Sequence, residues 1–491
     1  MTGLRPVAAS MGRGAAAALV GGLAFGAAMI ELGMLTSVAS LIQAEAPIIG
    51  FVVHMAVAAL IGTGFGLTVC YHRPRTGETL YWGLIYGALW WFLGPLTLMP
   101  LWLTGELAWS IARAQGALPS LLGHLGFGVV TALAFVAISR DTDRASPRAL
   151  RGPLVRGGVA GLSAAWLTGS ALAAQGALSA LSADSWLGVP GSGWALALII
   201  GLLAGMGFAL LHGRPREGSG VGIVRGALYG FVLWGVLPMT LLPILQGEGL
   251  AWTLTDARSA FPGLIGYLFL GALLGLVHHG LTTLARFLFG TNPADPHEEG
   301  LGTSALRALG RGAWAGILGG LAFTLVMLQT GVLPSVAGLV GASSGVAGFV
   351  VHLAIAILIG ASYGLLFRGR SYDRGSALGW GLSYGFVWWV LGALTLMPVF
   401  LGVAPDWSAA RAAELASSLV GHLAYGAALG LTYYAREARQ EPWWMPRSEV
   451  EARRVRFRQA QVLTSAPALW TLLVVLALLL PLLLSPAAGS P

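Results

Sequence analysis

The sequence has no lysine and only one cysteine. All 28 basic residues are arginine, which excludes a phosphate-binding loop built around a lysine. Cys70 has no second cysteine to pair with, which excludes an intramolecular disulfide framework and any multi-cysteine iron–sulfur or zinc site. Only 10% of the residues are charged, whereas a soluble globular protein carries about 25%. With 56% hydrophobic residues and a mean hydropathy of +0.76, the composition is typical of an all-α integral membrane protein.

Apolar runs of about 20 residues, the length that a helix needs to cross a bilayer, occur at roughly thirteen places. They cover residues 14–36, 49–70, 79–103, 118–139, 154–177, 193–212, 221–245, 261–284, 310–331, 346–367, 377–402, 416–435 and 466–485. If the N-terminus lies inside, only Arg113, Arg258 and Arg411 fall on outer segments. Because cytoplasmic loops are rich in basic residues, this predicts a bacterial inner-membrane protein with its N-terminus in the cytoplasm and its C-terminus outside. The net charge of +8 lies in these loops, so no nucleic-acid partner is predicted.

The chain contains internal repeats. A shift of 143 residues aligns "RGAAAALVGGLAF" at Arg13 with "RGGVAGLSAAW" at Arg156, and a shift of 298 aligns it with "RGAWAGILGGLAF" at Arg311. The same shifts align the third and fourth helices of each copy. The sequence therefore predicts three tandem four-helix transmembrane repeats plus one C-terminal transmembrane helix. The predicted parts are residues 1–145 (repeat 1), 146–300 (repeat 2, the divergent copy), 301–437 (repeat 3), and 438–491 (a basic cytoplasmic interfacial segment and the final helix).

Residues that recur in all three copies are interpreted as architectural, with the prolines at helix ends and the tryptophans as interface anchors. They are Tyr86, Tyr229 and Tyr384; Trp91, Trp234 and Trp389; Thr97, Thr240 and Thr395; Pro100, Pro243 and Pro398; and Trp109, Trp252 and Trp407. Four histidines do not recur and are interpreted as interface residues: His72, His212, His278 and His279. The motif "PWWMPR" predicts an interfacial helix before the last span.

A second set of residues is present in repeats 1 and 3 and absent from repeat 2. His54 and His352 become Ala197, His124 and His422 become Tyr267, and Met99 and Met397 become Leu242. Glu31 matches Gln329 and Ala174. With a rise of about 1.5 Å per residue and a hydrocarbon core of about 30 Å, Glu31, His54, Met99 and His124 lie at one level, just inside the outer boundary. Each comes from a different helix of the bundle.

A histidine inside a membrane span indicates function, and several functions fit these pairs. Histidines on diagonal helices could ligate haem b from both faces, with Gly126 and Gly128 leaving room for a flat ring. Two imidazoles and a methionine thioether suit copper, whereas imidazoles with Glu31 suit zinc or iron. These interpretations predict a membrane redox subunit that transfers electrons to other membrane subunits or to a quinone. A transporter or channel with histidines at its outer mouth, and a structural subunit of a larger complex, remain alternatives; an enzyme acting alone is not predicted.

The second to fourth helices of each repeat resemble the YagU-like family of small bacterial inner-membrane proteins. The resemblance lies in His54, "GTGFG" (62–66), "YWGLIYGAL" (81–89), "PLTLMP" (95–100) and "LLGHLGFG" (121–128). This chain differs in being tripled and in its C-terminal span. The resemblance implies a membrane protein with histidines near the outer face, from a family linked to acid tolerance, and it implies no defined activity.

Overall fold

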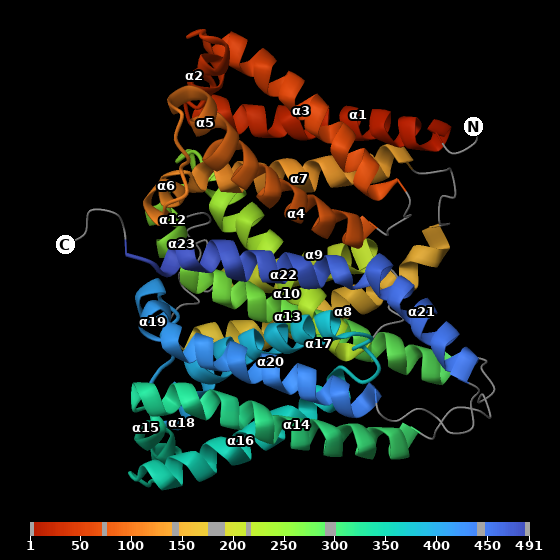
Figure 1. Ribbon diagram of the computed structural model, residues 1–491, viewed down its shortest axis with the longest axis vertical. Coiled ribbons are helices and arrows are strands. Elements are labelled where there is room, and N and C mark those ends of the chain that lie inside the picture. The colour runs from red at the N-terminus through yellow and green to blue at the C-terminus, as the bar shows by residue number, and fades with distance from the viewer. Residues whose placement is uncertain are drawn as a thin grey trace. The chain divides into compact units, whose positions relative to one another are not determined.

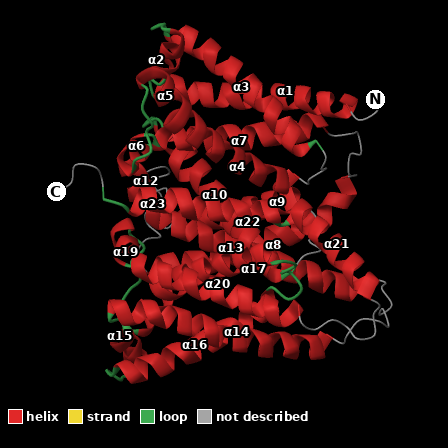
Figure 2. Ribbon diagram, viewed as in Figure 1, coloured by secondary structure: helices red, strands yellow, loops and turns green. Residues whose placement is uncertain are grey.

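The structure, a computed structural model, describes residues 4–70, 76–139, 147–174, 192–212, 218–289, 301–438 and 447–486. These residues form helices joined by short turns, and no strand occurs among them (Figure 2). The predicted all-α fold is therefore confirmed. Residues 71–75, which include His72, residues 140–146 and 213–217 of other predicted cytoplasmic loops, and most of the "PWWMPR" motif lie outside the described residues. Of the other histidines interpreted as interface residues, His212 and His278 are only 2–3% exposed, so that interpretation is wrong for both.

Eleven helices in the described ranges are long and apolar enough to cross a membrane, which makes this a multi-pass membrane protein in a lipid bilayer. They are Val7–Glu31, Pro47–Val69, Thr76–Thr104, Leu118–Ser139, Gly193–His212, Ser219–Gln246, Phe261–Ala285, Ala305–Thr330, Gly345–Leu366, Arg374–Phe400 and Ala466–Leu484. The two other predicted spans are also helical, as α8 (Pro147–Ala174) and α20 (Ala416–Ala438). Their described residues do not reach the hydropathy of the other eleven.

The chain forms two compact units. The first contains Met1–Ala149, Val232–Gly263 and Val462–Pro491, and the second contains Leu150–Phe231 and Leu264–Gln461. The first unit holds α1 (Leu4–Glu31), α2 (Leu35–Ala39), η1 (Ser40–Ile42), α3 (Pro47–Val69), α4 (Thr76–Leu93), η2 (Gly94–Leu98), α5 (Met99–Thr104), α6 (Ile111–Gly116), α7 (Leu118–Ser139), η4 (Leu237–Leu241), α11 (Leu242–Gln246), α12 (Leu254–Ser259), α22 (Ala466–Val474), η7 (Val475–Leu479) and α23 (Leu480–Leu484). The second holds most of α8, α9 (Ser192–His212), α14 (Leu301–Thr330), α15 (Leu333–Ala337), η5 (Gly338–Val340), α16 (Gly345–Leu366), α17 (Arg374–Trp388), η6 (Trp389–Leu396), α18 (Met397–Phe400), α19 (Ala409–Glu414), α20 and most of α21 (Arg447–Thr464). Helices α10 (Ser219–Val236) and α13 (Phe261–Phe289) contribute residues to both units.

The helices of repeats 1 and 3 pack in the same pairs (Figure 1). In repeat 1, α1 packs against α3 and α7, and α7 packs against α4. In repeat 3, α14 packs against α16 and α20, and α20 packs against α17. Glycines make these contacts close, since lipid provides no hydrophobic drive for helix association and small residues let backbones meet. A Cβ placed on Gly128 of α7 would lie 2.0 Å from the carbonyl oxygen of Gly83 on α4.

One glycine–alanine contact between the first two helices of each repeat is reversed in repeat 2. In repeat 1, Gly22 faces Ala58, with 2.9 Å between a built Cβ on the glycine and the alanine Cβ. Gly320 faces Ala356 in the same way in repeat 3, at 2.8 Å. At the matching positions of repeat 2, Ala165 of α8 faces Gly201 of α9. The summed side-chain volume at this crossing is thus unchanged although both residues differ.

The third helix of every repeat contains a π-helical segment, namely η2, η4 and η6. In each segment a threonine hydroxyl donates to the carbonyl five residues before it, at 2.8 Å, and accepts the indole N–H of an outer-loop tryptophan at 3.0–3.1 Å. The threonine–tryptophan pairs are Thr97–Trp109, Thr240–Trp252 and Thr395–Trp407. These bonds satisfy backbone groups that a π-segment leaves without α-helical partners. They also fix the outer loop to the third helix.

The tryptophans predicted to be interface anchors have a different role. Trp91, Trp234 and Trp389 are at most 1% exposed. Each donates its indole N–H to the backbone carbonyl 26 residues later, just before or at the start of the fourth helix, at 2.9–3.1 Å. The anchor interpretation is therefore wrong for these three residues. A fully buried indole needs a hydrogen-bond acceptor, and the fold supplies the same one in every repeat.

We expect Trp234→Phe to lower the free energy of unfolding by about 2 kcal/mol, because it leaves the part-buried Ala260 carbonyl without its indole donor. Titration with a denaturing detergent in mixed micelles would measure this. Trp470→Phe is the control, since Trp470 is 55% exposed and its loss should change little. Equal stability of the two variants would contradict the structural role of the buried indole.

The last transmembrane helix belongs to the first unit. Its α22 segment packs against α4 of repeat 1. The hydroxyl of Thr471 on α22 donates to the backbone carbonyl of Tyr81 on α4 at 3.2 Å, and both residues are buried. This contact joins the final helix of the chain to the first repeat.

The carbonyl end of that helix is held by two side chains. The Gln115 amide donates to the carbonyl of Leu482 at 3.1 Å, and the Arg258 guanidinium donates to the carbonyl of Leu483 at 3.0 Å. Both side chains also donate to the carbonyl of Ser485. Gln115 and Arg258 occupy the same position in repeats 1 and 2, 143 residues apart. They provide partners for carbonyls that a helix end leaves unpaired, and the Arg258 charge opposes the negative end of the helix dipole.

Candidate functional site

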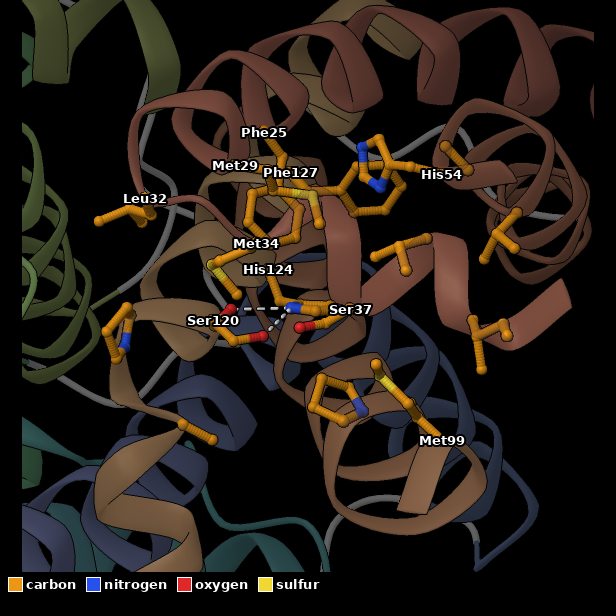
Figure 3. A pocket seen from close by; sticks show the side chains of 18 of the residues that line it. Phe25, Met29, Leu32, Met34, Ser37, His54, Met99, Ser120, His124 and Phe127 are labelled. Atoms are coloured by element: carbon orange, nitrogen blue, oxygen red, sulfur yellow. Dashed lines mark hydrogen bonds between the residues drawn. The ribbon is translucent and has the colours of Figure 1, made fainter. Parts of the chain in front are cut away.

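A cavity of about 480 Å³ lies inside repeat 1, at the end of the bundle where α2 and α6 lie (Figure 3). Its walls are mostly apolar, and the polar or sulfur-bearing side chains among them come from several elements. They are Met29 on α1, Met34 before α2, Ser37 on α2, His54 on α3, Met99 on α5, and Ser120 and His124 on α7. The structure therefore brings His54, Met99 and His124 to one cavity. We refer to it as the Met–His cavity.

Both imidazoles are oriented by backbone carbonyls. Nε2 of His54 lies 3.0 Å from the carbonyl oxygen of Gly22, and Nδ1 of His124 lies 2.7 Å from that of Ser120. A carbonyl can only accept, so these two ring nitrogens carry the proton in the neutral rings. The lone pairs then lie on Nδ1 of His54 and Nε2 of His124. Histidines that ligate metals are commonly fixed in this way, with the second ring nitrogen bonded to a carbonyl.

Phe25 contacts both imidazoles. Its ring centroid lies 5.5 Å from that of His54 and 4.9 Å from that of His124, with steep interplanar angles of 87° and 66°. The phenyl ring is buried, and it lies against Gly123, where a Cβ would come within 1.9 Å of it. Gly123 thus makes the room for Phe25 beside His124. A haem between the two imidazoles would require this phenyl ring to leave.

Repeat 3 reproduces this arrangement. Phe323 contacts His352 at 5.1 Å and His422 at 4.7 Å between ring centroids. Nε2 of His352 lies 3.1 Å from the carbonyl oxygen of Gly320, and Nδ1 of His422 lies 2.8 Å from that of Ser418. His352 is buried, and Met397 begins α18 directly after the π-segment η6. The two histidine pairs therefore share one geometry.

Other predicted features lie away from the cavity. Glu31 is exposed, and its carboxylate accepts the backbone N–H of Leu250 at 2.8 Å, so it does not line the cavity with the histidines. Gly126 is exposed, and no atom lies within 4 Å of a Cβ built on it. Beside Gly128, the backbone of α4 occupies the space that a side chain would need. Neither glycine lines the cavity that holds His54 and His124.

Sequence reasoning missed several residues of the site, and three of them recur in repeat 3 and change in repeat 2. Phe25 and Phe323 correspond to Thr168 in repeat 2, and Met29 and Met327 correspond to Leu172. Ser120 and Ser418 correspond to Gly263. The same shifts of 143 and 298 that revealed the histidines also reveal these positions. They were overlooked because a phenylalanine or methionine in a membrane span suggests ordinary packing.

The ligand chemistry available in the cavity is soft. Within the part of the chain that the structure describes, no group of three or more His, Cys, Asp or Glu side chains could hold a metal ion. The Met–His cavity instead combines two imidazoles with the thioethers of Met29, Met34 and Met99. Thioethers and imidazoles are donors suited to copper, and thioethers in particular to copper(I).

No protein-family model, curated protein or solved structure matches this chain.

Proposed function

We propose that this multi-pass membrane protein binds copper(I) in repeats 1 and 3, one ion in each, and serves as a copper-handling or electron-transfer subunit. The observation that carries the proposal is the joint loss of the donors in repeat 2. There, the two histidines become Ala197 and Tyr267, and the two repeated methionines become Leu172 and Leu242. Packing alone would not require nitrogen and sulfur donors to disappear together.

The hydrogen bonds of the histidines support the same proposal. Each imidazole of repeat 1 has one nitrogen bonded to a carbonyl and one lone pair left for a ligand. A copper(I) ion needs no flat slot between the rings, so Phe25 can remain beside both of them. Haem b, the other cofactor suggested by the histidine pairs, would displace Phe25. Its two axial positions would be taken by the histidines, so Met29, Met34 and Met99 would not serve as ligands.

The direct test is copper(I) binding by the purified protein in a neutral detergent, measured by competition with a chromophoric copper(I) chelator. We expect one ion for each of repeats 1 and 3, bound without a visible absorption band, since copper(I) has a filled d shell. Failure to compete with a weak chelator would exclude the site. A haem absorption band in protein purified from its host would instead favour the haem alternative.

A further inference from the structure

The Met–His cavity of repeat 1 has one more thioether than the matching positions of repeat 3 supply. A shift of 298 residues pairs Met29 with Met327 and Met99 with Met397. The third methionine of the cavity, Met34, corresponds instead to Val332 in repeat 3 and to Ala177 in repeat 2. Met34 is therefore the one sulfur donor of the cavity that has no counterpart in the other two repeats.

The turn after α1 holds Met34 against that helix. Gly33 has a φ of +66°, a left-handed conformation that favours glycine, and the N–H of Met34 donates to the carbonyl of Met29 at 2.9 Å. The N–H of Gly33 also donates to the carbonyl of Ile30 at 3.2 Å. These two hydrogen bonds define a Schellman motif, in which the side chain after the glycine commonly packs on the residue five positions before it. The turn thereby brings the two methionines to the same part of the cavity wall.

Repeat 3 turns at the same position but has a different side chain there. Gly331 has a φ of +67°, which matches the conformation of Gly33. The residue that follows is Val332, which is 40% exposed and has no donor atom in its side chain. The two repeats therefore share the left-handed glycine and differ in the chemistry of the residue after it.

Met34 lies where the wall of the cavity meets the exposed turn. Met29 is only 4% exposed, whereas Met34 is part-buried, and Gly33, Thr36 and Ser37 beside it are exposed. Figure 3 shows Met29, Met34 and Ser37 among the side chains of the cavity wall. A methionine side chain is unbranched and flexible, so its sulfur can adjust to an ion held by the histidines. Met34 thus offers a thioether that is accessible from the exposed turn.

We infer that Met34 is a third thioether ligand for copper(I) in repeat 1, and that it makes this site bind the ion more tightly than the site of repeat 3. The inference rests on the proposed function, and it adds that the two sites fill in order, repeat 1 first. The other donors are alike, since each repeat has two imidazoles bonded to equivalent carbonyls and two shared methionines. Because thioethers suit copper(I), the additional methionine is the chemical difference between the two donor sets.

A role in packing makes a different prediction for position 34. The Schellman motif needs only a hydrophobic contact at this residue. Leucine is close to methionine in volume, so it preserves that contact and removes the sulfur. Met34→Leu therefore distinguishes a ligand from a packing residue.

The test compares full-length chains that keep one site each, in neutral detergent. His352→Ala with His422→Ala leaves the site of repeat 1, and His54→Ala with His124→Tyr leaves the site of repeat 3. Competition with a chromophoric copper(I) chelator should give repeat 1 a Kd at least about 10-fold below that of repeat 3. Adding Met34→Leu to the first chain should remove this difference. Adding Val332→Met to the second chain should lower its Kd by about 10-fold.

X-ray absorption at the copper edge gives a second readout, because it counts the sulfur atoms bound to the ion. Met34→Leu should lower this count by one in the chain that keeps the site of repeat 1. If neither the Kd nor the sulfur count changes, the inference is wrong, although the proposed copper site stands. Absence of copper binding in both single-site chains overturns the inference and the proposed function together. If Met34→Leu does not fold, Val332→Met decides, and an unchanged Kd in that chain overturns the inference.

Discussion

Copper(I) binding in repeat 1 should disappear when its donors are exchanged for the residues that repeat 2 carries. The variant is Met29→Leu, His54→Ala, Met99→Leu and His124→Tyr, and each replacement already exists at the equivalent position of this chain. We expect the affinity of repeat 1 to fall by more than about 100-fold, because loss of even an outer-shell partner of a metal ligand costs about 10–100-fold. Chelator competition would then detect only the ion held by repeat 3.

Two further variants make this result specific. Met11→Leu changes a methionine of α1 that does not line the cavity, so it should bind as the wild type does. Adding His352→Ala and His422→Ala to the repeat 1 variant should remove the remaining ion. Full binding by the combined variant would show that copper is held elsewhere, and the Met–His cavity would then have no support as a metal site.

Gly128→Val should destabilise the protein strongly. The carbonyl oxygen of Gly83 lies 2.0 Å from the position of the new Cβ, and both atoms belong to helix backbones, so α4 and α7 must separate. Overpacking of this kind costs about 3 kcal/mol. The free energy of unfolding in mixed micelles measures the loss. Because α4 also contacts α22, we expect the variant to become more sensitive to proteolysis near the C-terminus as well.

Gly126→Ala is the matched control, two residues away on the same helix. Gly126 is exposed and has no atom within 4 Å of a built Cβ. The change should leave the free energy of unfolding unchanged or raise it by up to about 1 kcal/mol, since alanine favours helices over glycine. Similar losses in Gly126→Ala and Gly128→Val would mean that α4 and α7 do not approach through Gly83 and Gly128.

Much of the fold could be predicted from the sequence because a membrane-spanning helix is recognisable from its length and its apolar composition. A span needs about 20 apolar residues, and the apolar runs of this chain coincide with its long helices. Shifts of 143 and 298 residues also predicted that His54 and His124 would lie close together. Glu31 could not be placed in the same way, because it lies at the last residue of α1, where the chain turns and its carboxylate finds the Leu250 N–H.

Other features depend on contacts between residues far apart in the chain, which the repeat pattern and the spacing of apolar residues do not predict. The direction in which Trp91 points is decided by the Ala117 carbonyl 26 residues away, so its recurrence in all three repeats could not show that it is buried. Phenylalanine is common in any packed core, so the sequence gives Phe25 no special role. Only its ring contacts with His54 and His124 show that it belongs to the site. His278 has no histidine counterpart in the other repeats and was therefore interpreted as an interface residue. The absence of a counterpart says nothing about burial, so its contact with Phe208 could not be predicted.

The position of the last helix has a consequence for how the protein is made. Helix α22 and the segments after it complete the first unit, beside α4 and within reach of Gln115. Repeat 1 leaves the ribosome long before these residues are synthesised, by on the order of tens of seconds at common translation rates. During that interval the α4 surface that α22 will cover faces lipid or an insertion factor. Synthesis of the C-terminus is thus the step that completes the first unit, and a chain cut before Val462 should leave that unit open.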